Sequence, residues 1–497
     1  MPGLKSLARD TAIYGLSSIV GRFLNYLLVP LYTAKMSVAS GGYGVITNVY
    51  AMTALMLVIL TYGMETGFFR FVNRGDRDPL VAYGTTLTSV GTSSLAFIVL
   101  CLALLHPLAS WLGYGEHPEY IGMMAVVVAL DAFMCIPFAW LRYKQRPLKF
   151  AAVKMLFIIP NIGLNLFFYL GCPWLMEHAP ATVSWFYDPA YGVGYAFVAN
   201  FICTSCQLLF LLPEVAGFRW RFDRRLWREM MHYSLPILAL GVVGILNQTV
   251  DKIIYPHLLS DRGEAESQLA VYGAVSKVAM VMAMFTQAFR FAYEPFVFGK
   301  SRERDNRATY AEAMKFFVIF GLLAYLAVMC YIDLLKFIIA PDYWEGLKCV
   351  PVVMAAELFV GIYFNLSFWY KLIDQTQWGA YFSVIGLVIV LVLNVALVPR
   401  FGYMASAWAS LTGYAVITLL SYVIGQRRYP IAYDLKSIVR YMSLAAVLLV
   451  VRRLAATGIL WADTLTGTVL LAVFVAYVVR HDLPLSALPV VGRFFKK

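Results

Sequence analysis

Long apolar segments separated by short polar connections run through the whole chain. A helix needs about 20 mostly apolar residues to cross a hydrocarbon core roughly 30 Å thick. Segments that meet this requirement, bounded by charges or by Gly and Pro, lie at residues 8–33, 43–71, 80–106, 119–141, 148–171, 189–213, 229–259, 269–298, 310–339, 349–372, 378–399, 403–424, 438–456 and 458–479. The pattern predicts an all-α polytopic membrane protein with about fourteen transmembrane helices.

The composition narrows the class of protein further. Of the 497 residues, 61% are hydrophobic and 14% are charged, whereas average soluble domains have roughly 45–50% apolar and about 25% charged residues. A large soluble enzyme and a single-span receptor are therefore excluded.

The basic net charge is explained by where it falls along the chain. Lys and Arg number 40 against 28 Asp and Glu, a net charge of +12, which in a soluble protein would suggest nucleic-acid binding. Here the basic residues occupy alternate connections, as in the cytoplasmic loops of membrane proteins, and the connections 106–120 and 172–191 contain neither Lys nor Arg. We therefore expect membrane lipids and not nucleic acid as partners, and both termini in the cytoplasm.

Signatures of catalysis are missing from the sequence. No connection exceeds about 20 residues, which leaves no extramembrane domain to carry acid, base or metal chemistry. The chain also lacks the phosphate-binding G-x-x-x-x-G-K-[ST] loop, the H-E-x-x-H zinc motif and the G-x-S-x-G nucleophile motif. We expect a transporter and not an enzyme, with no catalytic residue, no metal site and no cofactor apart from a coupling H⁺ or Na⁺.

A weak internal repeat links the second predicted helix to the eighth. The segment 43–45 (Tyr-Gly-Val) aligns with 272–274 (Tyr-Gly-Ala), and the same offset pairs Asn48 with Lys277 and Glu65 with Glu294. Six helices separate the copies, so both halves should insert in the same direction, with substrate between them near the midplane. The predicted parts are an N-terminal bundle at 1–213, a basic cytoplasmic linker at 214–228, a C-terminal bundle at 229–424, helices thirteen and fourteen at 438–479, and a basic cytoplasmic tail at 480–497. The two six-helix bundles should be pseudo-symmetric.

Charged side chains within the apolar segments are candidates for function. A charge at the bilayer centre costs roughly 2.5–3.5 kcal/mol on insertion scales, so a charged residue within an apolar segment needs a structural or functional explanation. Arginine suits an anionic substrate, because its planar fork makes bidentate contacts to phosphate. The candidate substrate-binding residues are Arg22, Asn25, Arg70, Lys277, Gln287 and Arg290. The alternative is that such residues form buried ion pairs between helices or reach the headgroups from span ends.

Buried carboxylates are candidates for ion coupling. Asp251 is the first choice, because Asn247 lies one turn away and could complete an oxygen-rich site; Glu65 and Glu294 are further candidates. Lys252 points about 100° away along the helix, so it need not neutralise Asp251. The alternative is that Asp251 only pairs with a cavity arginine.

Several short segments resemble a known transporter family. They are residues 394–407 (NVALVPRFGYMASA), 21–24 (GRFL), 30–32 (PLY), 43–44 (YG), 65–71 (ETGFFRF) and 251–254 (DKII). Together they are similar to the polysaccharide-transport branch of the multidrug/oligosaccharidyl-lipid/polysaccharide (MOP) flippase superfamily. The resemblance implies two six-helix bundles that open alternately, often with two extra C-terminal helices. It also implies cavity arginines on helices one, two and eight, which Arg22, Arg70 and Arg290 could supply.

The resemblance also implies a function. The substrate would be an undecaprenyl-pyrophosphate-linked oligosaccharide, carried from the cytoplasmic to the periplasmic leaflet of a bacterial inner membrane for cell-surface polysaccharide such as lipopolysaccharide. A glycan polymerase and glycosyltransferases are candidate protein partners. Two alternatives stay open: a cation-coupled multidrug exporter of the same superfamily, and a polytopic enzyme of glycan assembly.

Overall fold

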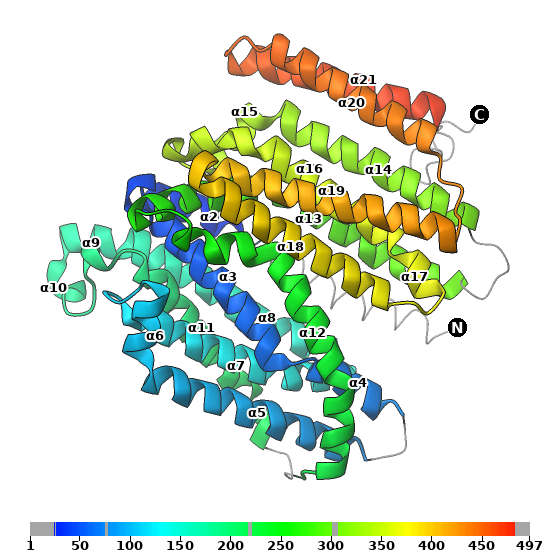
Figure 1. The fold of residues 1–497 in the computed structure, drawn as a ribbon. Coiled ribbons are helices and arrows are strands. Elements are labelled where there is room, and N and C mark those ends of the chain that lie inside the picture. The colour runs from blue at the N-terminus through cyan, green and yellow to red at the C-terminus, as the bar shows by residue number, and fades with distance from the viewer. Residues whose placement is uncertain (1–23, 25, 75–77, 217–220, 301–306, 483–497) are drawn as a thin grey trace. The chain divides into compact units, whose positions relative to one another are not determined.

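The computed structural model describes residues 24, 26–74, 78–216, 221–300 and 307–482 (Figure 1). Every regular element in this part of the chain is a helix. Twelve of the described helical segments are long and apolar enough to cross a membrane: Gly42–Val72, Pro79–Ala103, Pro118–Tyr143, Pro147–His178, Gly194–Ala216, Arg224–His257, Arg262–Arg290, Arg307–Cys330, Pro341–Leu372, Gln377–Phe401, Tyr403–Arg428 and Leu460–His481. They correspond to the second to twelfth and the fourteenth predicted helices, so the all-α polytopic class is confirmed.

The two other predicted helices account for the difference from fourteen. Most of the first predicted helix, 8–33, lies outside the described residues, and α2 (Leu28–Lys35) covers only its end. The thirteenth is present as α20 (Leu435–Leu454), but it carries Lys436, Arg440, Arg452 and Arg453 and does not qualify as an apolar span. A count of fourteen membrane crossings therefore stays a prediction.

Contacts along the chain group it into two compact units, residues 1–273 and 274–497, and the division falls within α13 (Arg262–Lys300). The first unit therefore includes α12 (Arg224–Ile254), which the sequence assigns to the second bundle. The predicted boundary at 214–228 and the two six-helix bundles stay predictions.

In the first unit, a central helix holds the bundle together. Besides α2 and α12 the unit contains α3 (Gly42–Thr61), α4 (Met64–Val72), α5 (Pro79–Ala103), α6 (Leu105–Leu112), α7 (Pro118–Tyr143), α8 (Pro147–Leu166), α9 (Cys172–His178), α10 (Pro180–Val183) and α11 (Gly194–Ala216). Helix α7 packs against α3, α5 and α11, while α12 packs against α3, α4 and α5. Met64, Phe68, Tyr83 and Met230 form part of the buried core between these helices.

The second unit is built around two long helices. It contains residues 274–300 of α13, and also α14 (Arg307–Cys330), α15 (Ile332–Leu335), α16 (Val350–Leu366), α17 (Phe368–Leu372), α18 (Gln377–Phe401), α19 (Tyr403–Arg428), α20 and α21 (Leu460–His481). Helix α19 packs between α16 and α18, whereas α14 packs against α16 and also against both α20 and α21. The two C-terminal helices therefore join the unit through α14, and α21 also contacts α15.

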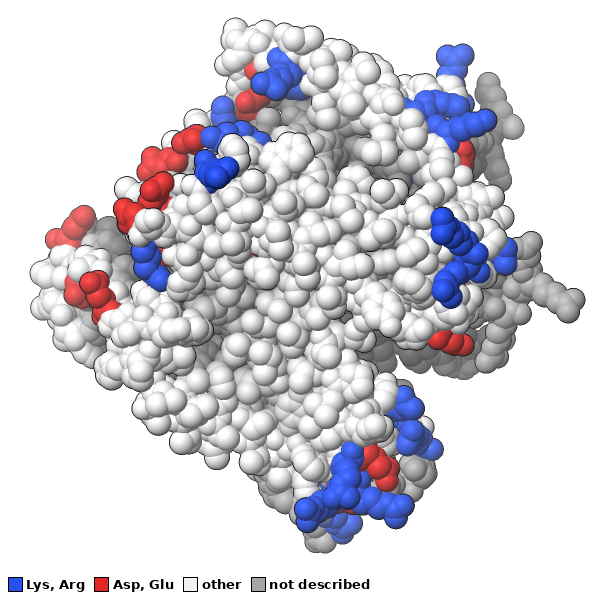
Figure 2. Space-filling view, viewed as in Figure 1, with Lys and Arg blue, Asp and Glu red and all other residues white. Residues whose placement is uncertain are grey.

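Charge is distributed unevenly over the first unit. Lys and Arg gather at the end where α4 finishes and α12 begins, whereas Asp and Glu lie toward the opposite end near α9 and α10 (Figure 2). The apolar residues between these ends include many that are exposed, among them Leu95, Val99 and Leu100 on α5. An apolar band between polar ends is the surface that a bilayer requires.

Candidate functional site

The second predicted helix is broken in the middle, and the break positions two candidate residues. Tyr62 and Gly63 have left-handed backbones, with φ of 31° and 71°, between α3 and α4. A Cβ on Gly63 would lie 3.0 Å from the carbonyl oxygen of Ser234 on α12. The position therefore suits glycine for both its conformation and its space. Glu65 follows in the first turn of α4, where the helix dipole favours a negative charge.

Glu65 and Arg70 have different partners in the structure. The Glu65 carboxylate forms an ion pair with Arg142 of α7, and the Arg142 guanidinium also lies 4.9 Å from the centre of the Phe69 ring. Arg70 is exposed and lies 4.1 Å above the ring of Tyr233 on α12. Glu65 thus takes part in an ion pair between helices, the alternative that the sequence left open. Arg70 lies at the surface of the unit.

Asp251 lies at the centre of a buried polar cluster. Asp251 is only 3% exposed. Its Oδ2 accepts a hydrogen bond of 2.8 Å from the Tyr272 hydroxyl. The Nζ of Lys252 lies 3.1 Å from both carboxylate oxygens. The sequence interpretation that Lys252 points away from Asp251 is therefore wrong in this structure, because the four-carbon stem of lysine spans the angle between neighbouring positions. Asn247 is also buried, and its amide donates to the Val243 carbonyl at 2.9 Å.

Asn48 connects this end of α12 to α3. Its Nδ2 donates to the carbonyl oxygens of Lys252 at 2.7 Å and Ile253 at 3.1 Å, and its Oδ1 accepts from the Tyr114 hydroxyl at 2.8 Å. Burial raises the pKa of Tyr114, so its hydroxyl remains a donor at any physiological pH. The Arg262 guanidinium lies 4.8 Å from the Tyr114 ring and its Nε donates to Glu266 at 2.9 Å.

Two glycines that the repeat aligns both lie where α3 meets the first turns of α13. A Cβ on Gly44 would overlap the carbonyl oxygen of Glu266 and lie 3.0 Å from the backbone nitrogen of Ala270. A Cβ on Gly273 would overlap the side chain of Thr47. The contact positions rise together along both helices, so α3 and α13 run in the same direction and approach at backbone distance.

In the second unit, two cations share one aromatic ring. The Arg290 guanidinium of α13 lies 4.4 Å from the centre of the Phe364 ring, and the Nζ of Lys371 on α17 lies 5.1 Å from the same centre. Lys371 is also 5.0 Å from the ring of Phe368. Cations held beside aromatic faces keep their positive charge and can still offer N–H donors to an anion.

The remaining candidates are placed less completely. Lys277 and Gln287 are half-buried on α13, in the second unit. Glu294 lies within α13, but its side chain is outside the described residues, as are Arg22 and Asn25 altogether. Groups of three or more His, Cys, Asp or Glu side chains that could hold a metal ion do not occur among the described residues.

Sequence reasoning missed Lys371, Tyr272 and the role of Arg142. Lys371 lies in a short aromatic run, Phe368–Leu372, where a cation next to several rings was an available signal. In the sequence Tyr272 serves only to align the repeat, and Arg142 is one of the basic residues near the connections between predicted helices. Their partners lie on other helices, so spacing along one helix could not reveal them.

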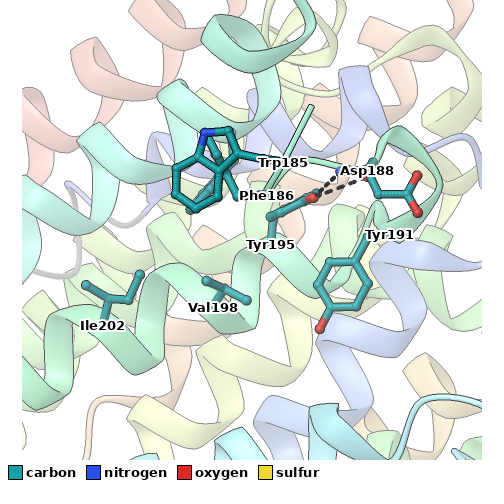
Figure 3. A pocket seen from close by; sticks show the side chains of 8 residues that line it. Trp185, Phe186, Asp188, Tyr191, Tyr195, Val198 and Ile202 are labelled. Carbon is teal, nitrogen blue, oxygen red and sulfur yellow. Dashed lines mark hydrogen bonds between the residues drawn. The ribbon is translucent and has the colours of Figure 1, made fainter. Parts of the chain in front are cut away.

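An aromatic pocket of about 510 Å³ opens on the first unit beside α10 and α11. Figure 3 shows Trp185, Phe186, Tyr191 and Tyr195 around it. The Tyr195 hydroxyl accepts a hydrogen bond of 2.7 Å from the Asp188 backbone nitrogen, which orders the connection that leads into α11. Among the residues that the structure describes, Lys and Arg do not line this pocket, so its surface suits an acyl chain or the apolar face of a ring and not a phosphate.

Comparison with known proteins identifies the fold. No protein-family model matches the sequence, and no curated protein does either. The structure is similar to lipid II flippase MurJ in an inward closed conformation, with a TM-score of 0.73 and 13% identity over 95% of this chain and 99% of that chain. It is also similar to an inward-facing multidrug resistance MATE family transporter of the MOP superfamily, with a TM-score of 0.61 and 12% identity over 84% of this chain and 94% of that one.

A third similar structure is that of the MATE multidrug transporter DinF-BH, with a TM-score of 0.59 and 16% identity over 85% of this chain and 96% of that chain. At these identities the likeness concerns the fold alone. The chain has the fold that these flippase and transporter structures share.

Proposed function

We propose that this chain is a flippase of the polysaccharide-transport branch of the MOP superfamily. Its substrate would be an undecaprenyl-pyrophosphate-linked oligosaccharide, moved by alternating access from the cytoplasmic to the periplasmic leaflet of a bacterial inner membrane. The observation that carries the proposal is the likeness to MurJ over 95% of the chain, compared with 84% for the MATE transporter. The two matches differ in the length of this chain that they cover by about 55 of its 497 residues. This length is enough to include α20 and α21.

The charge of the candidate residues supports an anionic substrate. Arg290 and Lys371 lie around one ring in the second unit, and Arg70 is exposed on α4 in the first. A pyrophosphate carries its charge on oxygens that accept several hydrogen bonds, and guanidinium groups match that geometry. Arg22, Asn25, Lys277 and Gln287 stay further candidate substrate-binding residues.

Topology and ion coupling form part of the same proposal. Both termini would be cytoplasmic, because the basic end of the first unit carries the connections that the positive-inside rule assigns to the cytoplasm (Figure 2). Transport would use an H⁺ or Na⁺ gradient through Asp251, Asn247, Glu65 or Glu294. One charge that moves through 100 mV supplies about 2.3 kcal/mol.

A multidrug exporter is the second candidate, because MATE transporters share the fold. Buried acidic groups such as Asp251 could equally serve a cationic substrate. The two candidates differ in the charge of what they carry, and this difference can be measured.

Transport by the purified full-length chain in proteoliposomes tests the proposal. One assay follows translocation of a fluorescent undecaprenyl-pyrophosphate oligosaccharide, and a parallel assay follows a lipophilic cationic dye. We expect gradient-dependent movement of the anionic lipid and no movement of the dye. Movement of the dye alone would replace the flippase proposal by the exporter. Complementation of a bacterium that lacks its own flippase extends the test, and Arg22→Ala should abolish it at normal protein levels.

A further inference from the structure

A small pocket at the basic end of the first unit combines cations, aromatic rings and a buried carboxylate. It has a volume of about 280 Å³ and is lined in part by Tyr83 of α5, Trp140 of α7, Lys144 and Arg146 of the α7–α8 connection, and Glu214 of α11. We call it the α7–α8 pocket. It is separate from every residue assigned above to substrate or ion coupling.

The turn that presents the two cations is well defined. Gln145, between them, has a left-handed backbone with φ of 53°, a conformation that non-glycine residues seldom adopt and that is often kept for function. The Arg146 backbone nitrogen donates to the Leu141 carbonyl at 3.0 Å, and that of Lys144 donates to the Trp140 carbonyl at 2.9 Å. The turn therefore directs Lys144 and Arg146 into one pocket lining, just ahead of the first turn of α8, where helix N–H groups favour an anion.

Ring stacking and a hydrogen bond between helices form the wall of the pocket. The rings of Tyr83 and Trp140 stack with centres 4.6 Å apart, and the Nζ of Lys144 lies 4.7 Å from the Trp140 ring. The Tyr83 hydroxyl donates to the Glu214 carbonyl at 3.1 Å. This framework joins α5, α7 and α11, so the pocket does not depend on a single loop.

The Glu214 carboxylate is an independent observation that points to a ligand. Its side chain is only 6% exposed, and its Oε1 lies 2.5 Å from the Nζ of Lys149. Its Oε2 is buried and has no hydrogen-bond partner among the described residues. A buried acceptor of this kind is rare in folded proteins, and it suits a ligand that brings a hydroxyl group. Lys144, Arg146 and Lys149 supply three positive charges and Glu214 one negative charge, so the formal net charge around the pocket is +2.

The pocket also adjoins apolar surface at its rim. Leu80, one of its lining residues, is 44% exposed, and Leu148, just beyond the basic turn, is 74% exposed. A ligand in the pocket thus has apolar side chains beside it for a hydrocarbon tail. At about 30 Å³ per water molecule, the volume corresponds to about nine waters, which is enough for a phosphoglycerol group but not for an oligosaccharide.

We infer that the α7–α8 pocket binds the phosphoglycerol headgroup of an anionic membrane lipid. The phosphate contacts Lys144 and Arg146, a headgroup hydroxyl donates toward Glu214, and the acyl chains lie along Leu80. The inference concerns a lipid that stays bound at the membrane surface, and it holds whatever the transported substrate is.

Native mass spectrometry of the full-length chain in detergent tests the inference, with lipids added one at a time. Phosphatidylglycerol should be retained about tenfold or more tightly than phosphatidylethanolamine or phosphatidylcholine, since it alone adds a net negative charge. Phosphatidylmethanol, which has the same charge but no hydroxyl, should bind more weakly than phosphatidylglycerol. Equal retention of the zwitterionic lipids would overturn the anionic site, and equal retention of phosphatidylmethanol would overturn the role of Glu214.

Matched variants locate the binding. Lys144→Gln with Arg146→Gln keeps the exposed side-chain stems and removes both charges, and it should abolish the preference for phosphatidylglycerol. Arg224→Gln with Arg228→Gln removes two exposed charges from the same end of the unit, outside the pocket, and should leave the preference unchanged. If both double variants behave like the wild type, the pocket is not the site. Competition with soluble sn-glycerol 3-phosphate shows whether the ligand is a lipid or a soluble phosphate. If millimolar sn-glycerol 3-phosphate does not displace phosphatidylglycerol, the lipid is supported. If it displaces phosphatidylglycerol completely, the lipid proposal is overturned in favour of a soluble phosphate.

Discussion

The hydroxyl of Tyr272 on α13 donates a hydrogen bond of 2.8 Å to Oδ2 of Asp251 on α12. Because the Nζ of Lys252 also lies 3.1 Å from both oxygens of the same carboxylate, Asp251 has partners on both of its oxygens. A proton or Na⁺ that binds this carboxylate competes with its ion pair to Lys252. A change in the charge of the Asp251 side chain would therefore also change how α12 packs against α13.

Asp251→Asn should remove the response of transport to an imposed gradient. The amide preserves the shape but cannot take up a proton or supply a full negative charge to a cation. The measurement is flipping in proteoliposomes under an imposed ΔpH, Na⁺ gradient or membrane potential. Tyr272→Phe is the control, because it removes one hydrogen bond and leaves the carboxylate ionisable, and it should keep the response. An Asp251→Asn protein that responds like the wild type would exclude Asp251 from coupling.

Gly44→Ala should destabilise the packing of α3 on α13. The new methyl group would overlap the Glu266 carbonyl, and overpacking of this kind typically costs about 1–3 kcal/mol. We expect a lower midpoint of thermal unfolding in detergent. Gly163→Ala is the control, since no atom lies within 4 Å of its added Cβ and alanine favours a helix by up to about 1 kcal/mol. Equal midpoints for the two variants would show that the close approach of α3 and α13 is not needed for stability.

Arg290→Ala and Lys371→Ala should each impair flipping while the protein accumulates normally. Each removes one cation beside Phe364, and a hydrogen bond to a charged group contributes about 1.5–3 kcal/mol, equivalent to roughly a tenfold to hundredfold loss in affinity. Binding of the pyrophosphate lipid and complementation both report the effect. Arg400→Ala, at an exposed end of α18, serves as the control and should behave like the wild type. Full complementation by Lys371→Ala would remove that residue from the site.

Arg452→Ala should weaken the attachment of the two C-terminal helices. Arg452 is 7% exposed, and its guanidinium lies 2.6 Å from Asp333 and 3.7 Å from Asp463. Loss of one partner from a buried pair costs about 3–5 kcal/mol, and because Asp333 is partly exposed we expect a value near the lower end. Arg453→Ala is the control, since Arg453 directly follows Arg452 but is exposed. Limited proteolysis between α19 and α20 measures the effect, and equal cleavage of both variants would contradict it.

Hydropathy is enough to predict most of the fold. Membrane insertion depends on the summed transfer free energy of each segment, and that sum is a property of the local sequence. The membrane-spanning helices from α3 to α19 are therefore predicted correctly in kind and nearly in position. The break at Tyr62 and Gly63 was missed, since it depends on the close approach of α12 and not on the apolar pattern.

The sequence by itself determined that the chain is an all-α membrane protein, that its basic connections alternate, and which side chains lie within apolar segments. Only the tertiary structure decided the partners of those side chains. Lys252 turns back onto Asp251, Arg142 pairs with Glu65, and Lys371 joins Arg290 at Phe364. The physical reason is that a charged side chain in a low-dielectric interior takes the partner that neighbouring helices bring within reach, and helix packing is a non-local property.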